Sequence, residues 1–226
     1  MSDGQRPRRP WPKPAAALIL LLAVVSLLSF LLFRDRSETG QQRAALPGGA
    51  RQTTAGGGFL GTLALPARQA PAIDLRDYLG RRVTLAQYRG RAVLVTFLYT
   101  HCPDVCPLIA SNLGVALDLL GARARQAQVI AVSVDPHGDT PAAVARFLRA
   151  HGMVGRMQYL IGSGSELART WSAWSVGSRR EVGHPELVDH SALVYGVSAS
   201  GRLTTLYPAT FEPSKIAHDV PKLVAR

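Results

Sequence analysis

Cysteine is scarce in this chain, and acidic residues are scarce as well. Only two cysteines occur among 226 residues, too few for an iron–sulfur cluster or for a zinc site closed by thiolates alone. Asp and Glu number 15 against 26 Lys and Arg, which gives a formal charge of +11. Beyond residue 57 the basic residues stand mostly singly, whereas nucleic-acid-binding proteins usually cluster them in a stripe. We therefore predict a solvated basic surface and no nucleic-acid binding.

Long hydrophobic runs are absent except for one, residues 15–33, which are apolar and uncharged. As a helix this run would span about 28 Å, close to the hydrocarbon thickness of a bilayer. Basic residues predominate before it, so the positive-inside rule places the N-terminus in the cytoplasm. A cleaved signal peptide is the alternative, but the run is long for one and no small-x-small site ends it. A mitochondrial transit peptide is hard to fit before the run, which favours a bacterial inner membrane.

These features predict four segments along the chain. They are a cytoplasmic N-terminus at 1–13, a transmembrane anchor at 14–33, a flexible linker at 34–57 and a folded domain at 58–226. The linker is polar and Gly-rich, and a chain of that length would reach about 25–30 Å. The predicted protein is therefore single-pass, in the bacterial inner membrane, with its soluble domain in the periplasm.

The predicted domain alternates strand-like and helix-like stretches. Residues 91–99 and 127–135 are continuous apolar runs rich in β-branched residues, as in strands buried on both faces. Helices are expected at 107–121, 140–152, 165–174 and 212–224, the last ended or kinked by Pro221, and a hairpin at 191–207 around Ser200–Gly201. This order predicts a thioredoxin-like α/β domain, with a central mixed sheet flanked by helices and a C-terminal hairpin.

Both cysteines lie in THCPDVCPL, residues 100–108, at the predicted junction between a strand and a helix. Pro103–Asp104 suits a tight turn that would fold Cys102 back towards Cys106. Pro107 disfavours the helical conformation for the residue before it, so we expect Cys106 at or near the helix N-cap and not inside the helix. Free backbone N–H groups there would favour a thiolate.

Spacing alone leaves three interpretations of the cysteine pair open. A structural disulfide is the commonest use of a lone pair in an oxidising compartment, although a bridge over so short a loop would stabilise the fold little. A copper site is the second, because thiolates select soft metal ions. A redox pair is the third, although the three residues between the cysteines differ from the two of a plain thioredoxin motif.

Copper held by two thiolates would need a third ligand, and an imidazole suits it. The histidines are His101, His137, His151, His184, His190 and His218. His151 and His218 lie on helical stretches and are expected to be solvated, and strand alternation should turn His101 away from Cys102. His190 stands at the entrance of a strand, from which a side chain can reach a site above the sheet. Composition and spacing alone do not select it.

Three motifs make the chain resemble the Sco/SenC family of copper-binding assembly proteins. They are YRGRAVLVTFLYTHCPDVCP at 88–107, VSVDPHGDTP at 132–141 and VDHSALVYGVSASGRL at 188–203. The resemblance covers about residues 58–224, in the family's order. One departure is that GVSASGRL lacks the Asp-Pro that often precedes the hairpin glycine in the family, at a place away from the ligands.

The resemblance implies a thioredoxin-like domain that binds one copper ion, as Cu(I) or Cu(II), through Cys102, Cys106 and His190. It also implies a membrane-tethered metallochaperone rather than an enzyme. Its partner would be subunit II of cytochrome c oxidase, whose binuclear copper centre it would help to assemble, or another copper-accepting protein.

Residues around these motifs also have simpler explanations. Asp139 and Thr140 can cap the helix expected at 140–152. Asp135 and Asp189 could orient a metal ligand, or they could be charges at strand ends. Among enzymes, a thiol–disulfide oxidoreductase that reduces a partner's cysteines would use the same thiols without needing a distant histidine. A thiol peroxidase matches less well, because Tyr99 stands where a peroxidase usually has threonine.

Overall fold

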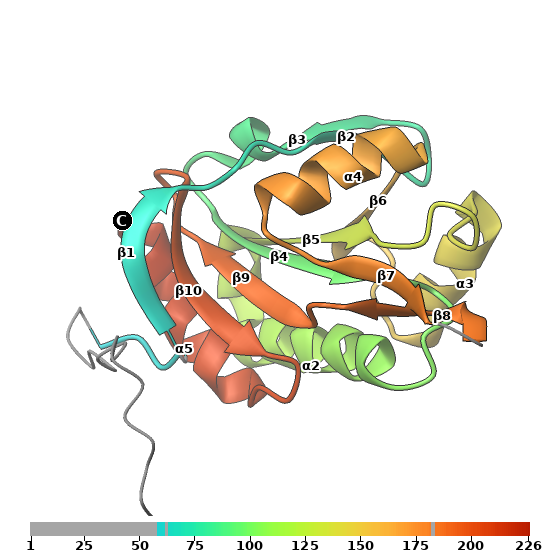
Figure 1. Ribbon diagram of the computed structural model, residues 1–226. Coiled ribbons are helices and arrows are strands. Elements are labelled where there is room, and N and C mark those ends of the chain that lie inside the picture. The colour runs from blue at the N-terminus through green and yellow to red at the C-terminus, as the bar shows by residue number, and fades with distance from the viewer. Residues whose placement is uncertain (1–57, 62, 182–183) are drawn as a thin grey trace, which may run out of the picture. The chain divides into compact units, whose positions relative to one another are not determined.

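A computed structural model of the chain describes residues 58–61, 63–181 and 184–226 (Figure 1). The predicted cytoplasmic segment, anchor and linker lie outside the described residues. The strands of the described domain are β1 (Leu63–Gln69), β2 (Asp74–Asp77), β3 (Arg82–Thr84), β4 (Ala92–Leu98), β5 (Ala127–Ser133), β6 (Met157–Ile161), β7 (Ser178–Glu181), β8 (His184–His190), β9 (Leu193–Val197) and β10 (Arg202–Pro208). The helices are η1 (Leu85–Tyr88), α2 (Val105–Leu120), η2 (Gly121–Gln126), α3 (Pro141–Ala150), α4 (Gly164–Ala173) and α5 (Pro213–Val224).

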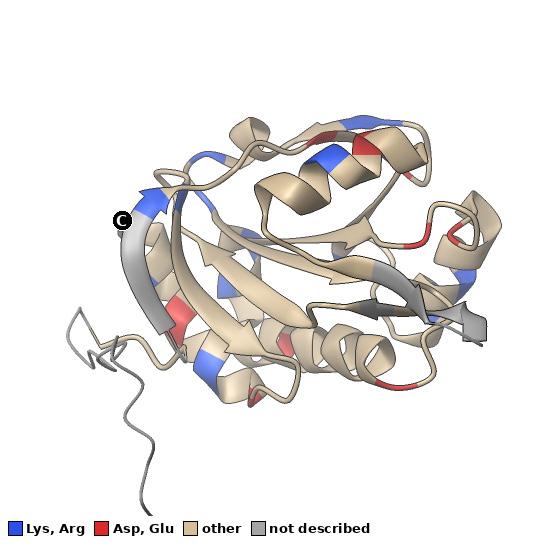
Figure 2. Ribbon diagram, viewed as in Figure 1, with Lys and Arg blue, Asp and Glu red and all other residues tan. Residues whose placement is uncertain are grey.

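An eight-stranded mixed sheet forms the centre of the domain, in the order β1-β10-β9-β4-β5-β6-β2-β3. β4, β5 and β6 run parallel, and the other neighbours pair antiparallel. α2 and α5 lie side by side on one face of the sheet, and α4 lies on the other (Figure 1). β7 and β8 form a separate two-stranded sheet beside the start of α2. Lys and Arg are spread over several elements in the view of Figure 2, as the sequence predicts.

The central strands are buried because they have neighbours on both edges and helices over both faces. Every residue of β4 is buried, and Thr96, its only polar residue, satisfies its hydroxyl on the Leu193 carbonyl at 3.0 Å. Each fully buried Val, Leu or Phe side chain contributes about 1.5–3 kcal/mol relative to an exposed one. The continuous apolar runs in the sequence therefore predicted these strands correctly.

The helix signals in the sequence are confirmed with one exception. Thr140 caps α3 by accepting a hydrogen bond from the Ala143 N–H at 3.2 Å, and Pro141 occupies the first helical position. Pro221 does not end α5, which continues to Val224. A proline within the last turns removes one backbone hydrogen bond, and the buried apolar face of α5 offsets that loss.

Among the described residues, only the segment Val105–Gln126 is long and apolar enough to cross a membrane by length and composition. Ile109, Leu113 and Leu117 on α2 are buried in the core. A core helix passes the same test as a membrane span, so the apolar character of α2 is explained by its packing.

Asp219 of α5 fastens the first described residues to the C-terminal helix. Its buried carboxylate accepts hydrogen bonds from the N–H groups of Leu60 and Gly61, at 2.9 and 2.8 Å, and from the Tyr207 hydroxyl at 2.8 Å. The His218 Nδ1 atom lies 2.9 Å from the same carboxylate. The chain therefore enters the domain at a fixed point on α5.

Asp219→Ala is expected to destabilise the domain by about 3 kcal/mol, because it leaves the buried Tyr207 hydroxyl and two part-buried backbone N–H groups without an acceptor. The matched control is Glu212→Ala, which removes an exposed acid at the N-cap of the same helix, where it pairs with Lys215 at 3.1 Å. Its cost should stay below about 1 kcal/mol. Urea unfolding of the full chain, followed by circular dichroism, measures both, and equal losses would mean that Asp219 does not hold the two segments together.

Candidate metal centre

The two cysteines lie between the end of β4 and the first turn of α2. The helix begins at Val105 after Asp104 as N-cap, so Cys106 is the second helical residue. The expected position near the N-cap is confirmed, but Cys106 lies inside the helix and not before it. Pro107 is tolerated directly after it, because the N–H groups of the first turn have no partner within the helix in any case.

The loop before α2 folds Cys102 back over the start of the helix, as the Pro103–Asp104 turn predicted. The Cys106 N–H points at the Cys102 sulfur, 3.4 Å away, and the Cys102 N–H bonds the Tyr99 carbonyl at 3.4 Å. Both cysteines are buried and both are free thiols in the structure. The pair is therefore held together without a disulfide.

The two thiols have opposite pKa shifts. The Cys106 thiol donates a hydrogen bond to the Cys102 sulfur, and this is the main reason that the pKa of Cys102 is lowered to about 5. The N–H groups of Asp104 and Cys106 and the Tyr99 hydroxyl act in the same direction, and burial opposes them. The same hydrogen bond, together with burial, raises the pKa of Cys106. The Cys106 thiol, helped by the N–H groups of Asp104 and Cys106, therefore favours a thiolate on Cys102, not on Cys106 as expected.

We expect iodoacetamide to alkylate Cys102 of the reduced, metal-free full chain with a midpoint near pH 5, because the thiolate is the nucleophile. The reaction should slow as the pH falls through that value and stay nearly constant above it. Mass spectrometry of quenched samples measures the rate at each cysteine. The same chain in urea is the control, and both cysteines should then titrate near the ordinary value of 9.0. A midpoint near 9.0 for Cys102 in the folded chain would show that the hydrogen bonds around its sulfur do not stabilise the thiolate.

His190 reaches the cysteines from a distant part of the chain, at the end of β8. Its Nε2 atom lies 3.6 Å from the Cys106 sulfur. The ring also meets Tyr99 edge to face, with centroids 5.8 Å apart. The structure therefore brings together Cys102, Cys106 and His190, the three residues predicted as metal ligands.

Tyr99 connects β8, which carries His190, to the cysteine loop. The sequence did not indicate this role for Tyr99. Its hydroxyl accepts a hydrogen bond from the Val188 N–H of β8 at 3.4 Å and hydrogen-bonds the Cys102 sulfur. Burial is the main reason that the pKa of Tyr99 is raised to about 12, so the hydroxyl keeps its proton. An aromatic residue at the end of a buried strand, just before the motif, was the available signal in the sequence.

The donor set fits a soft metal ion such as copper, because it combines two sulfurs and one imidazole nitrogen. The Cys106 sulfur lies at its centre, in contact with both Cys102 and His190. Within the described ranges, no group of three or more His, Cys, Asp or Glu side chains meets the geometry of a metal site as it stands. A bound ion would have to replace the hydrogen bonds that now link these side chains.

Asp139 supports the cysteine loop and does not cap α3, which corrects the prediction. Its Oδ1 atom accepts a hydrogen bond from the Thr100 N–H at 2.8 Å. Its Oδ2 atom accepts from the Ser133 and Tyr159 hydroxyls, at 2.6 and 2.9 Å. These buried donors turn the carboxylate inward, so Thr140 caps the helix alone. Burial raises the pKa of Asp139, and the donors oppose that shift.

The remaining candidate residues lie elsewhere or outside the description. Asp135 is buried and accepts a hydrogen bond from the His137 N–H at 3.2 Å. The side chain of Asp189 is outside the described part of the chain. His101 is exposed and lines a pocket that none of the proposed ligands lines, so the prediction that it turns away is confirmed. Strand alternation is not the reason, because β4 ends at Leu98 and His101 lies in the loop that follows.

This chain is similar to known proteins in both sequence and structure. A family model described as SCO1/SenC matches residues 64–225. The mitochondrial SCO2 homolog of Bos taurus is 31% identical over 157 residues, which cover 67% of this chain and 58% of that protein. This chain thus spans less than two thirds of the length of that relative.

Solved structures agree with the sequence comparison. Bradyrhizobium japonicum ScoI with copper bound is 28% identical, with a TM-score of 0.62, over 69% of this chain and 99% of that one. Apo Sco1 from Thermus thermophilus is 32% identical, with a TM-score of 0.59, over 78% of this chain and 99% of that one. These likenesses confirm the predicted thioredoxin-like fold class for the described domain.

Proposed function

Because this chain belongs to the SCO1/SenC family, we propose that it is a copper metallochaperone that holds one copper ion on Cys102, Cys106 and His190. The observation that carries the proposal is the contact of the Cys106 sulfur with both other side chains, including the His190 Nε2 atom at 3.6 Å. The copper-bound Bradyrhizobium japonicum relative supports the choice of metal.

The two thiols would take different parts in copper binding. Cys102, with its lowered pKa, offers a thiolate at neutral pH, whereas Cys106 must release its proton before it can bind the metal. Cys106 is fully buried and Cys102 is 8% exposed. His190 is more exposed than either cysteine, so an acceptor would approach from the side of Cys102 and His190, where its own ligands can replace those of this chain one at a time.

The partner in this proposal is subunit II of cytochrome c oxidase, during assembly of its binuclear copper centre, or another copper-accepting protein. Residues 14–33 would anchor the chain in a bacterial inner membrane, residues 1–13 would remain in the cytoplasm, and residues 34–57 would tether the domain of residues 58–226 in the periplasm. The apolar run at 15–33 and the basic residues before it support this arrangement.

A thiol–disulfide oxidoreductase is the second candidate, and the Cys102 thiolate beside a protonated Cys106 favours it. Cys102 would attack a partner's disulfide, releasing one partner thiolate, and Cys106 would then resolve the mixed disulfide and release the other. The partner would gain two electrons, and Cys102 and Cys106 would become a disulfide.

Copper titration tests the leading proposal. The reduced full chain, in mild detergent, should bind one equivalent of copper and lose that binding after both thiols are alkylated. Cu(II) bound through thiolate should add a visible charge-transfer band. Equal copper binding before and after alkylation would place the metal elsewhere.

A further inference from the structure

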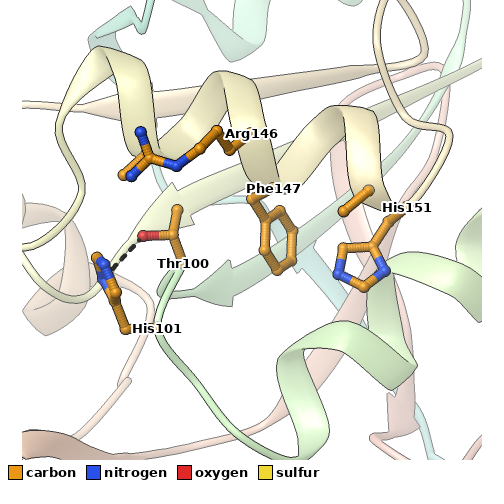
Figure 3. Close-up of a pocket in the computed structure, with 7 residues that line it drawn as sticks. Thr100, His101, Arg146, Phe147 and His151 are labelled. Atoms are coloured by element: carbon orange, nitrogen blue, oxygen red, sulfur yellow. Dashed lines mark hydrogen bonds between the residues drawn. The ribbon is translucent and has the colours of Figure 1, made fainter.

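A pocket of about 360 Å³ lies beside the cysteine loop, outside the proposed copper site. Thr100 and His101 line it from the loop that follows β4. Arg146, Phe147 and His151 line it from α3 and its C-terminal end (Figure 3). Nothing in the proposed copper chemistry uses these five side chains.

Arg146 brings one permanent positive charge to this pocket. The guanidinium of Arg146 forms no ion pair or side-chain hydrogen bond with the described part of the chain. His151 packs on Phe147, with ring centroids 4.6 Å apart, and its Nδ1 atom lies 3.3 Å from the Ser111 hydroxyl. Burial lowers the pKa of His151, so its imidazole is neutral at pH 7.

The other groups of the pocket are fixed polar atoms and an apolar wall. The Thr100 hydroxyl lies 3.1 Å from the His101 Nδ1 atom and also hydrogen-bonds the buried Asp139 carboxylate. The Asp139 carboxylate also accepts a hydrogen bond from the Thr100 N–H, so this loop has a defined position. Phe147 supplies the apolar wall (Figure 3). One guanidinium beside an apolar wall suits a monoanionic carboxylate on a short aliphatic stem. A phosphate dianion would need a further cation.

We propose that this pocket receives an aspartate or glutamate side chain of the protein that exchanges copper or thiols at Cys102, with Arg146 as its main contact. This inference rests on the proposed function, because it concerns the partner of that same site. Thr100 and Cys102 are two residues apart, so their Cα atoms lie within about 8 Å. The partner's acidic residue must therefore lie close to its own copper-accepting residues.

Two synthetic peptides test the pocket. Both carry a Cys-x-x-x-Cys pair, with flanking glutamates in one and flanking glutamines in the other. Fluorescence anisotropy measures their binding to the reduced, copper-free full chain. We expect the glutamate peptide to bind about tenfold more tightly, because a bidentate Arg–carboxylate contact is worth about that factor. Free acetate at the same concentration should not compete, because it lacks the rest of the partner surface.

Arg146→Gln should abolish the preference for the glutamate peptide. The matched control is Arg149→Gln, which removes a neighbouring exposed charge of α3 that does not line the pocket and should keep the preference. Arg146→Glu should prefer a third peptide with lysines in place of the glutamates.

The copper titration, run in parallel, separates this inference from the proposed function. Arg146→Gln with normal copper binding but no peptide preference supports the pocket as the partner's carboxylate site. Equal binding of both peptides by the unmodified chain overturns the inference even where copper binds. A preference that persists in Arg146→Gln, or that Arg149→Gln removes equally, also overturns it. If the unmodified chain binds no copper but the preference depends on Arg146, the proposed function fails and the pocket assignment stands.

Discussion

Serine in place of either Cys102 or Cys106 is expected to lower the affinity of the full chain for Cu(I) by about a thousandfold or more, which corresponds to about 4 kcal/mol. A hydroxyl is a hard ligand that does not replace a soft thiolate. The loss should be larger for Cys106→Ser, because the Cys106 sulfur contacts both other proposed ligands. Competition with a chelator of known Cu(I) affinity, in anaerobic buffer, measures both variants.

The near-isosteric change should leave the fold intact, and circular dichroism of each variant provides that control. Cys102→Ser also separates the two thiols in the alkylation experiment, since only the buried Cys106 remains. Undiminished affinity in both single variants would show that copper binds elsewhere on the chain.

His190→Ala is expected to weaken copper binding by more than about a hundredfold, which corresponds to about 3 kcal/mol, because it removes one of three ligands. The Cu(II) form should also lose the nitrogen hyperfine signal in its electron paramagnetic resonance spectrum. The dithiol should still oxidise, because Cys102 and Cys106 contact each other without the histidine. The unfolding midpoint should change little, since the ring fills little of the core.

His101→Ala is the matched control, and it should bind copper almost normally. His101 adjoins Cys102 in the sequence, but its ring lines the pocket beside Thr100 and Arg146 (Figure 3). If His101→Ala weakens copper binding and His190→Ala does not, the proposed ligand set is wrong. If neither matters and disulfide exchange with a partner persists, the oxidoreductase proposal replaces the chaperone.

The parts of the fold that could be predicted are those with strong local signals. β4 and β5 are buried on both faces, so their residues form continuous apolar runs. α3 is marked at its start by the Thr140–Pro141 cap, and its predicted and observed bounds differ by one or two residues. β7 and β8 were not predicted, because polar sequences such as SRRE form strands only through their pairing with each other.

The residues of the proposed metal site also differ in how far apart they lie in the sequence, and only the close pair could be recognised from spacing. The cysteine pair is visible because its two members lie four residues apart at a strand–helix junction. His190 is 84 residues from Cys106, so its position came from the resemblance and not from spacing. The inward turn of Asp139 depends on Tyr159 and Ser133, two hydroxyls that only the folded sheet brings near it.

The proton that Cys106 donates to Cys102 should make copper binding depend on pH. Between the pKa of Cys102, about 5, and the raised pKa of Cys106, the pair carries one proton. In the proposed site, copper would displace that proton, so each ion taken up would release one proton equivalent from the thiols. The apparent affinity of the pair should then change about tenfold per pH unit across this interval. Acidic surroundings would promote release of the ion, and alkaline surroundings would promote retention.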